Sequence, residues 1–146
     1  MCGIVGIYAF GEHESLIEEK LIDTMRDTMI HRGPDGAGTY VSDDGRIGLG
    51  HRRLSIIDLS SSAAQPMTNF TNDIWIVFNG EIYNHRELRL ELEGLGYIFL
   101  TDHSDTEVII NSFFEWGIDC VSKFIGMFAF AMWDSRDKNL WVVRDR

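Results

Sequence analysis

The chain has 146 residues, of which 45% are hydrophobic, as expected for one globular domain with its own core. Its formal net charge of −10 argues against binding to nucleic acid or to an anionic membrane, because both need a basic surface. Two cysteines, Cys2 and Cys120, form neither a disulfide framework nor a zinc-binding pattern. The first apolar run, residues 4–10, is too short for a signal peptide or a membrane span. We therefore expect a cytoplasmic protein without a metal site.

The N-terminal part of the chain predicts one strand followed by one helix. The apolar run at residues 4–10 is typical of a buried strand. Ser15 is followed three residues later by Glu18, and this capping box predicts that a helix begins there. The apolar residues of this helix recur at helical spacing and comprise Ile17, Leu21, Ile22, Met25 and Met29. We therefore expect an amphipathic helix that buries this face.

The middle of the chain predicts short strands separated by loops. Gly and Pro interrupt the helical pattern at residues 31–38, which we expect to form a loop. Apolar segments predict strands at residues 38–42, 46–51, 54–58 and 74–78. Residues 59–73 are polar and are expected to form a long loop. The strand that starts at residue 74 is expected to end in a turn at Asn79 and Gly80.

The C-terminal half predicts two helices, a third short helix and a pair of strands. Each of the two helices begins with a cap residue and an acidic residue three positions later, Asn84 with Glu87 and Ser104 with Glu107. The short helix is expected to begin at Asp119, and the strands are expected at residues 127–133 and 140–143. These strands are apolar on both faces in places, which favours layered helices and sheets over a lone sandwich.

Cys2 directly follows Met1, and a small residue at position 2 permits removal of Met1. Cys2 would then carry both a thiol and a free α-amine. An α-amine has a reference pKa of about 7.7–8.0, so it can act as a base near neutral pH. A nucleophile with a built-in base is one way in which enzymes activate a weak nucleophile. Taken alone, this position more often holds a buried strand cysteine without chemistry.

Three further features could bind or react, and each also has a purely structural interpretation. The Asn79 amide and the Gly80 N–H could stabilise an oxyanion, although Asn-Gly is more often an ordinary turn. Arg52 or Arg53 could hold a carboxylate, or form a structural ion pair. Asp105 could balance an ammonium group, or only complement the helix dipole. Without further information, the structural interpretation is favoured for each.

Two histidines and the second cysteine are weaker candidates. His31 and His51 are the type of residue that most often acts as a general base, but neither has an evident Ser or Cys partner in the sequence. Cys120 lies in a helical context beside Val121 and is expected to be a structural thiol.

Six segments, taken together and in order, resemble one protein family. They are residues 1–6, 31–35, 53–58, 79–84, 104–107 and 126–131. Their order and spacing resemble the class II glutamine amidotransferase domain of the asparagine synthetase type, and the resemblance covers essentially residues 1–146. It implies the α+β fold of N-terminal-nucleophile hydrolases, a four-layer α/β/β/α sandwich in which two mostly antiparallel sheets lie between helices.

The resemblance also implies a role for each matching residue. Cys2 is the implied nucleophile, and its own α-amine is the implied base. The residues implied to bind glutamine are Arg53, Leu54, Ile56, Asn79, Gly80, Glu81 and Asp105. Among them, Arg53 matches the residue that binds the substrate α-carboxylate, and Asp105 matches the partner of its α-ammonium group. Asn79 and the Gly80 N–H match the oxyanion hole, and no metal or cofactor is implied for this domain.

The implied function is hydrolysis of glutamine through a Cys2 thioester, which supplies ammonia for an amide-forming synthetase reaction, most simply asparagine synthesis from aspartate. The expected partner is a C-terminal synthetase domain that uses ATP and Mg²⁺; this sequence has no Gly-rich phosphate loop of its own. A different ammonia acceptor, such as a sugar or peptide precursor, and a catalytically silent regulatory module remain alternatives. The last residues, 144–146, read as part of a strand, so we expect a truncated domain, with homo-oligomers left open.

Overall fold

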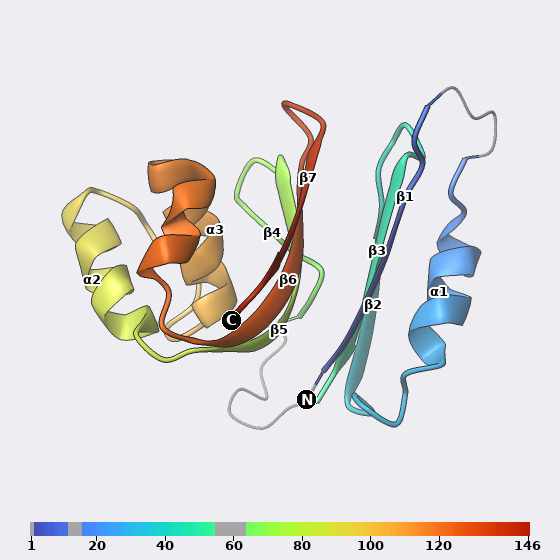
Figure 1. Ribbon diagram of the computed structural model, residues 1–146, viewed down its shortest axis with the longest axis horizontal. Helices are drawn as coiled ribbons and strands as arrows, with labels where there is room; N and C mark the ends of the chain where they lie inside the picture. The colour runs from blue at the N-terminus through green and yellow to red at the C-terminus, as the bar shows by residue number, and fades with distance from the viewer. Residues whose placement is uncertain (1, 12–15, 55–63) are drawn as a thin grey trace.

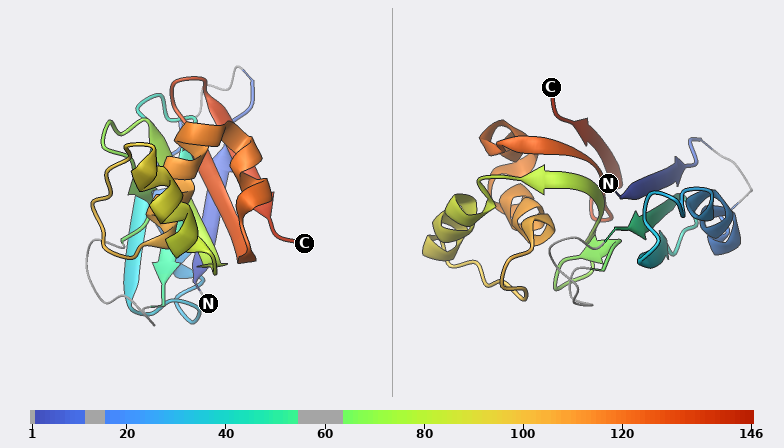
Figure 2. Two further views of the ribbon diagram at one scale, coloured as in Figure 1. Left: turned by 90° about the vertical axis from the view of Figure 1, so that its left-hand side faces the viewer. Right: turned by 90° about the horizontal axis from the view of Figure 1, so that it is seen from below.

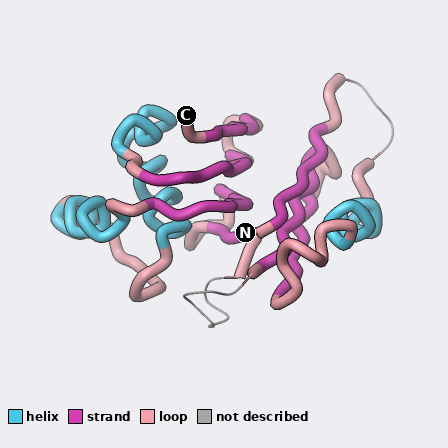
Figure 3. Tube along the Cα trace, turned by 60° about the horizontal axis from the view of Figure 1, so that its bottom comes forward, coloured by secondary structure: helices cyan, strands magenta, loops and turns pink. Residues whose placement is uncertain are grey.

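The computed structural model describes residues 2–11, 16–54 and 64–146, and these form four layers (Figure 1). A three-stranded sheet and a four-stranded sheet pack face to face, with one helix outside the first and two helices outside the second (Figure 3). Neighbouring strands in both sheets are antiparallel. The α+β, four-layer fold expected from the sequence is confirmed. Within the described part of the chain, no helix is long and apolar enough to cross a membrane.

The three-stranded sheet, called here the first sheet, has the order β1-β3-β2. Its strands are β1 (Gly3–Tyr8), β2 (Gly36–Val41) and β3 (Ile47–Arg53). In the register, Gly3 of β1 lies opposite Arg52, and Gly36 of β2 lies opposite Arg53. The starts of β1 and β2 and the end of β3 therefore meet at one end of the sheet.

Helix α1 (Glu19–Asp27) covers the outer face of the first sheet through Ile22, which is fully buried. Ile22 fits against Gly48 of β3, where an added Cβ would lie only 2.6 Å from the Ile22 side chain. Leu21, by contrast, is 49% exposed. The buried face of α1 is therefore centred on Ile22, and Leu21, which was predicted to belong to it, does not. The predicted start is also corrected: Glu18 is the N-cap, without a side-chain hydrogen bond, and Ser15 lies outside the described residues.

The four-stranded sheet, called here the second sheet, has the order β4-β5-β6-β7. Its strands are β4 (Met67–Thr68), β5 (Ile74–Ile82), β6 (Gly126–Asp134) and β7 (Asn139–Arg144). The long loop predicted for residues 59–73 therefore contains the short β4, while residues 59–63 lie outside the description. In the strand predicted at 54–58, Leu54 is not in a strand and the other residues are not described.

The turn predicted at Asn79 and Gly80 is wrong, because β5 continues through both residues to Ile82. Asn79 lies opposite Ala129 and Gly80 opposite Phe128 in the ladder with β6. The strand that pairs with this part of β5 is β6, which comes more than forty residues later in the sequence. No local pattern could therefore predict this pairing. Gly80 is required there by close packing, since an added Cβ would overlap the Met127 carbonyl oxygen and lie 2.5 Å from Phe128 Cα.

The outer face of the second sheet is covered by α2 (His85–Gly94) and α3 (Asp105–Trp116), followed by the 3₁₀ helix η2 (Gly117–Lys123) (Figure 2). The apolar residues between these helices and the sheet form the larger core of the molecule. Its fully buried members include Ile74, Ile76, Ile82, Leu92, Ile109, Cys120 and Met132. The short helix predicted from Asp119 is this 3₁₀ helix.

The two predicted caps differ. Ser104 caps α3 as expected, with its Oγ accepting from the Glu107 N–H at 3.3 Å. The Glu107 carboxylate does not return to Ser104 but accepts hydrogen bonds from the Leu100 and Thr101 N–H groups. The box predicted at Asn84 is wrong: the Asn84 amide donates to the Lys123 carbonyl oxygen and accepts from the Ile125 N–H, which ties α2 to the segment before β6.

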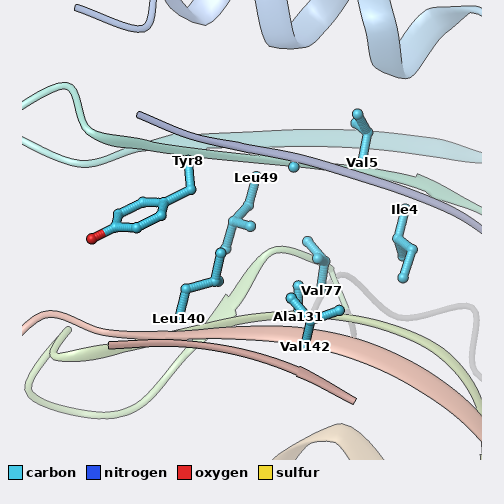
Figure 4. A pocket seen from close by; sticks show the side chains of 9 residues that line it. Ile4, Val5, Tyr8, Leu49, Val77, Ala131, Leu140 and Val142 are labelled. Carbon is cyan, nitrogen blue, oxygen red and sulfur yellow. The ribbon is translucent and has the colours of Figure 1, made fainter. Parts of the chain in front are cut away.

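The two sheets meet through alternate residues of their strands, as Figure 4 shows. Ile4, Tyr8 and Leu49 of the first sheet face Val77 and Ala131 of the second, and an apolar pocket of about 220 Å³ lies between them. Because side chains alternate along a strand, positions two residues away from these also face the space between the sheets. This alternation decides which of the candidate site residues share a face.

Candidate active site

Cys2 lies at the start of β1, half-buried, in contact with the residue that follows β3. Its Sγ accepts a hydrogen bond from the Leu54 N–H at 3.4 Å and lies 3.9 Å from the Leu54 carbonyl oxygen. The Cys2 carbonyl oxygen accepts from Arg32 Nε at 3.3 Å. These contacts fix the candidate nucleophile beside the end of β3. In Figure 3 the N-terminus lies at the end of the sandwich where the two sheets approach each other.

The two arginines at the end of β3 point in opposite directions. Arg52 faces α1, where its Nη2 lies 2.8 Å from Asp27 Oδ1. Arg52 therefore forms the structural ion pair that the sequence left open. Arg53 follows Leu49 at a spacing of four residues along β3, so alternation directs it towards the second sheet. Arg53 is thus the one of this pair that faces the same space as the start of β1.

Asn79 lies on the face of β5 that is directed towards the first sheet. It follows Val77, which lines the pocket between the sheets, by two residues. Its main chain pairs with Ala129 of β6, and its side chain is partly exposed. The amide of Asn79 therefore lies on a paired strand and points towards the first sheet, to the face of β3 on which Arg53 lies.

The Gly80 N–H points to the free edge of β5. On that edge, the Phe78 N–H donates to Gln65 Oε1 at 2.6 Å, and the Ile82 N–H donates to Asp105 Oδ2 at 3.2 Å. N–H groups of alternate residues point the same way along an antiparallel strand, so the Gly80 N–H lies between these two on the same edge. Among the described residues, no acceptor is found for it. This N–H is available to an oxygen atom of a ligand.

Asp105 is the first residue of α3 and lies beside the same edge of β5. Burial raises the pKa of the Asp105 carboxyl above its ordinary value, while the Ile82 N–H and the nearby His85 act in the opposite direction. A buried carboxylate of this kind gains from a cationic partner, which replaces part of its lost hydration. The position therefore fits the recognition of an ammonium group.

Three further residues were predicted for the site: Leu54, Ile56 and Glu81. Leu54 contacts Cys2 through its main chain, as described above. Glu81 follows Gly80 in β5, and its side chain is exposed. Ile56 lies outside the described residues. The described residues contain no cluster of three or more His, Cys, Asp or Glu side chains that could hold a metal ion.

Among the hydrogen bonds of the described residues, none joins Cys2 to His31 or His51. His31 is exposed, whereas His51 is buried on β3 with its Nε2 3.1 Å from the Phe78 carbonyl oxygen. Burial lowers the pKa of His51 to about 4. Cys120 is fully buried in the larger core, as expected of a structural thiol, and burial raises the pKa of its thiol to about 12.

Sequence reasoning missed two residues that support β5. His51 and Gln65 bind the carbonyl oxygen and the N–H of Phe78, directly before Asn79. The only local signal for His51 is its position two residues before Arg53, on the same face of β3. Gln65 had no local signal, because its partner is thirteen residues away in another element.

The fold matches that of a solved amidotransferase. The glutamine phosphoribosylpyrophosphate amidotransferase from B. subtilis, in complex with ADP and GMP, matches with a TM-score of 0.80. The match covers 97% of this chain and 37% of that chain at 21% sequence identity. This chain therefore shares the fold of that protein, two antiparallel sheets between layers of helices.

Sequence comparison gives the family. The glutamine amidotransferase domain model matches residues 1–146, and the chain belongs to this family, in the class II branch of asparagine synthetase type. Asparagine synthetase [glutamine-hydrolyzing] 1 of Bacillus subtilis is 45% identical over 99% of this chain and 22% of that protein. Asparagine synthetase B of Escherichia coli is 40% identical over 99% of this chain and 25% of that protein. The chain thus spans about a quarter of the length of these relatives.

Proposed function

We propose that this domain hydrolyses glutamine to glutamate and ammonia through a thioester on Cys2. The ammonia is proposed to serve an amide-forming synthetase reaction, the formation of asparagine from aspartate, on a C-terminal domain that uses ATP and Mg²⁺. One observation carries the proposal: the Gly80 N–H has no acceptor among the described residues and lies on the strand edge that also binds Asp105. An N–H held in this way is suited to an oxyanion.

Recognition of glutamine follows from the two charges at its α-carbon. A guanidinium such as that of Arg53 can bind the α-carboxylate through two parallel hydrogen bonds. The half-buried Asp105 carboxylate can bind the α-ammonium group, which offsets the burial that raises its pKa. The side-chain amide of glutamine is then directed towards Cys2. Binding energy from the α-carbon is used in this way to orient the reacting amide.

The chemistry begins once Met1 is removed, because only then does Cys2 have a free α-amine. This amine accepts the thiol proton, and the sulfur attacks the amide carbon of glutamine. The oxyanion that forms is stabilised by the Asn79 amide and the Gly80 N–H. The protonated amine gives its proton to the departing nitrogen, which leaves as ammonia. Water then cleaves the thioester, with the amine again acting as base; glutamate is released and the free thiol is regenerated.

A mechanism-based label tests this assignment. The glutamine analogue 6-diazo-5-oxo-norleucine should alkylate Cys2 in the purified chain, and glutamine should slow the reaction. Peptide mass spectrometry should locate the adduct on Cys2, while Cys120 serves as an internal control because it is fully buried. N-terminal sequencing of the same sample should begin at Cys2. An adduct on another residue, or no adduct on a chain that begins at Cys2, would contradict the proposal.

A further inference from the structure

His51 joins the two sheets directly behind the proposed oxyanion site. It lies on β3, is 1% exposed, and its Nε2 lies 3.1 Å from the Phe78 carbonyl oxygen on β5. A carbonyl oxygen only accepts hydrogen bonds, so Nε2 carries the hydrogen and donates it. The neighbouring contacts between the sheets are apolar, through Leu49 and Val77. A buried polar bond within such a contact fixes one relative position of two strands more sharply than apolar packing does.

The bond acts on the peptide group that leads into Asn79. The carbonyl of Phe78 and the N–H of Asn79 belong to one planar peptide unit. Its Asn79 end is paired with Ala129 of β6, and its Phe78 end is held by His51. The preceding N–H, that of Phe78, donates to Gln65 Oε1 at 2.6 Å. The orientation of this unit therefore sets where the Asn79 side chain and the following Gly80 N–H point.

We propose that His51 is a positioning residue for the oxyanion site, acting through its hydrogen bond to the Phe78 carbonyl. This inference rests on the proposed function, because it assigns His51 a role in glutamine hydrolysis. Without the hydrogen bond from His51, the Phe78–Asn79 peptide group is no longer held by the first sheet. The Asn79 amide and the Gly80 N–H then point at the developing oxyanion less often. Binding of glutamine at its α-carbon, through Arg53 and Asp105, is not affected.

The test compares His51→Leu with a control on the same strand and face. We expect His51→Leu to lower kcat for glutamine hydrolysis by about tenfold to a hundredfold, a part of the loss seen when an oxyanion donor is removed, with KM within about twofold of wild type. Leu49→Ala removes a fully buried side chain from the same face of β3 and should lower the melting temperature without lowering kcat. His51→Gln, which keeps an N–H donor, should recover part of the lost kcat. Circular dichroism should show that all three variants are folded.

A second measurement does not depend on turnover. The aldehyde analogue of glutamate adds to a cysteine thiol to give a tetrahedral adduct whose oxygen occupies the oxyanion site. Its affinity should fall in His51→Leu by about the same factor as kcat, whereas the affinity for glutamate should stay unchanged. Equal losses of kcat in Leu49→Ala and His51→Leu, or a wild-type kcat in His51→Leu, would overturn the role of His51 alone. A wild-type protein that hydrolyses no glutamine would overturn the proposed function together with it.

Discussion

The two sheets contribute different kinds of groups to the candidate site. The first sheet contributes side chains at strand ends, Cys2 before β1 and Arg53 at the end of β3. The second sheet contributes a stretch inside a strand, because Asn79 and Gly80 lie within β5 and its pairing with β6 continues before and after them. A side chain at a strand end can be changed without disturbing a ladder, whereas a change inside a paired strand affects the sheet itself. Substitutions in the two sheets should therefore separate chemistry from folding.

The largest expected effect comes from the first sheet. We expect Cys2→Ala to reduce glutamine hydrolysis to below about one thousandth of the wild-type rate, because it removes the nucleophile and leaves the strand pairing of β1 intact. The rate of ammonia release and the circular dichroism spectrum measure the two properties. Cys120→Ala is the control and should show the reverse, with lower stability and retained activity, since Cys120 belongs to the core. Activity of Cys2→Ala within a few-fold of wild type would contradict the mechanism.

The next effect comes from the second sheet. Gly80→Ala should lower kcat by about 10²–10³ and also destabilise the fold, because its Cβ would overlap the Met127 carbonyl oxygen in β6. Asn79→Ala should lower kcat to a similar extent but keep the melting temperature close to wild type, since the Asn79 side chain is partly exposed. Thermal melts and steady-state kinetics on both variants test the distinction. If both variants melt like wild type, the close packing of Gly80 against β6 is not a constraint on the strand.

Binding of glutamine should depend on Arg53 from the first sheet and on Asp105 from α3, beside the second sheet. Arg53→Ala and Asp105→Asn each remove a charge that binds the α-carbon of glutamine, so KM should rise at least about tenfold. Asp105→Asn keeps an oxygen that can accept from the Ile82 N–H, and it removes a half-buried charge, so the fold should stay as stable as wild type. Arg52→Ala is the matched control for Arg53, because Arg52 pairs with Asp27 on the outer face. An unchanged KM in both Arg53→Ala and Asp105→Asn would show that the glutamine pocket lies elsewhere.

The last expected effect is on stability and not on activity, and it concerns the bond between the sheets. Burial, with the nearby Arg53 charge acting in the same direction, lowers the pKa of His51 to about 4, while its bond to Phe78 opposes the shift. Between pH 6.5 and 4 the unfolded chain therefore binds a proton at His51 that the folded chain does not, so stability falls as the pH falls through this range. The loss should be on the order of 3 kcal/mol at the acidic end.

Urea unfolding of wild type and His51→Leu at pH 7 and pH 4.5 measures this contribution. The difference between the two pH values should be smaller in the variant, because the variant has no group that protonates at this position. The comparison cancels the other titrating groups, which are shared by both proteins. An identical pH dependence in both proteins would show that His51 is accessible to protons in the folded state.

Most elements could be predicted from the sequence because their signals are local. The strands at β1, β3, β6 and β7 follow from apolar runs, and Ser104 caps α3 as predicted. The prediction of a turn at Asn79 and Gly80 was wrong because β6, the strand that pairs with this end of β5, is remote in the sequence. Asn84 likewise binds the segment before β6 and not its own helix. Where a side chain has both a local and a distant partner available, the sequence shows only the local one.

The same division applies to the candidate site. The sequence by itself determined the family through six ordered motifs, and it determined which residue types are available: a thiol at position 2, an arginine, an Asn-Gly pair and an acid in the first turn of a helix. Only the tertiary structure decided that Arg53 and not Arg52 faces the space between the sheets, and that the Gly80 N–H lies on the free edge of β5. It also decided that His51 and Gln65 support the strand before Asn79. The physical reason is that strand alternation and long-range pairing, which set these directions, depend on partners far away in the chain.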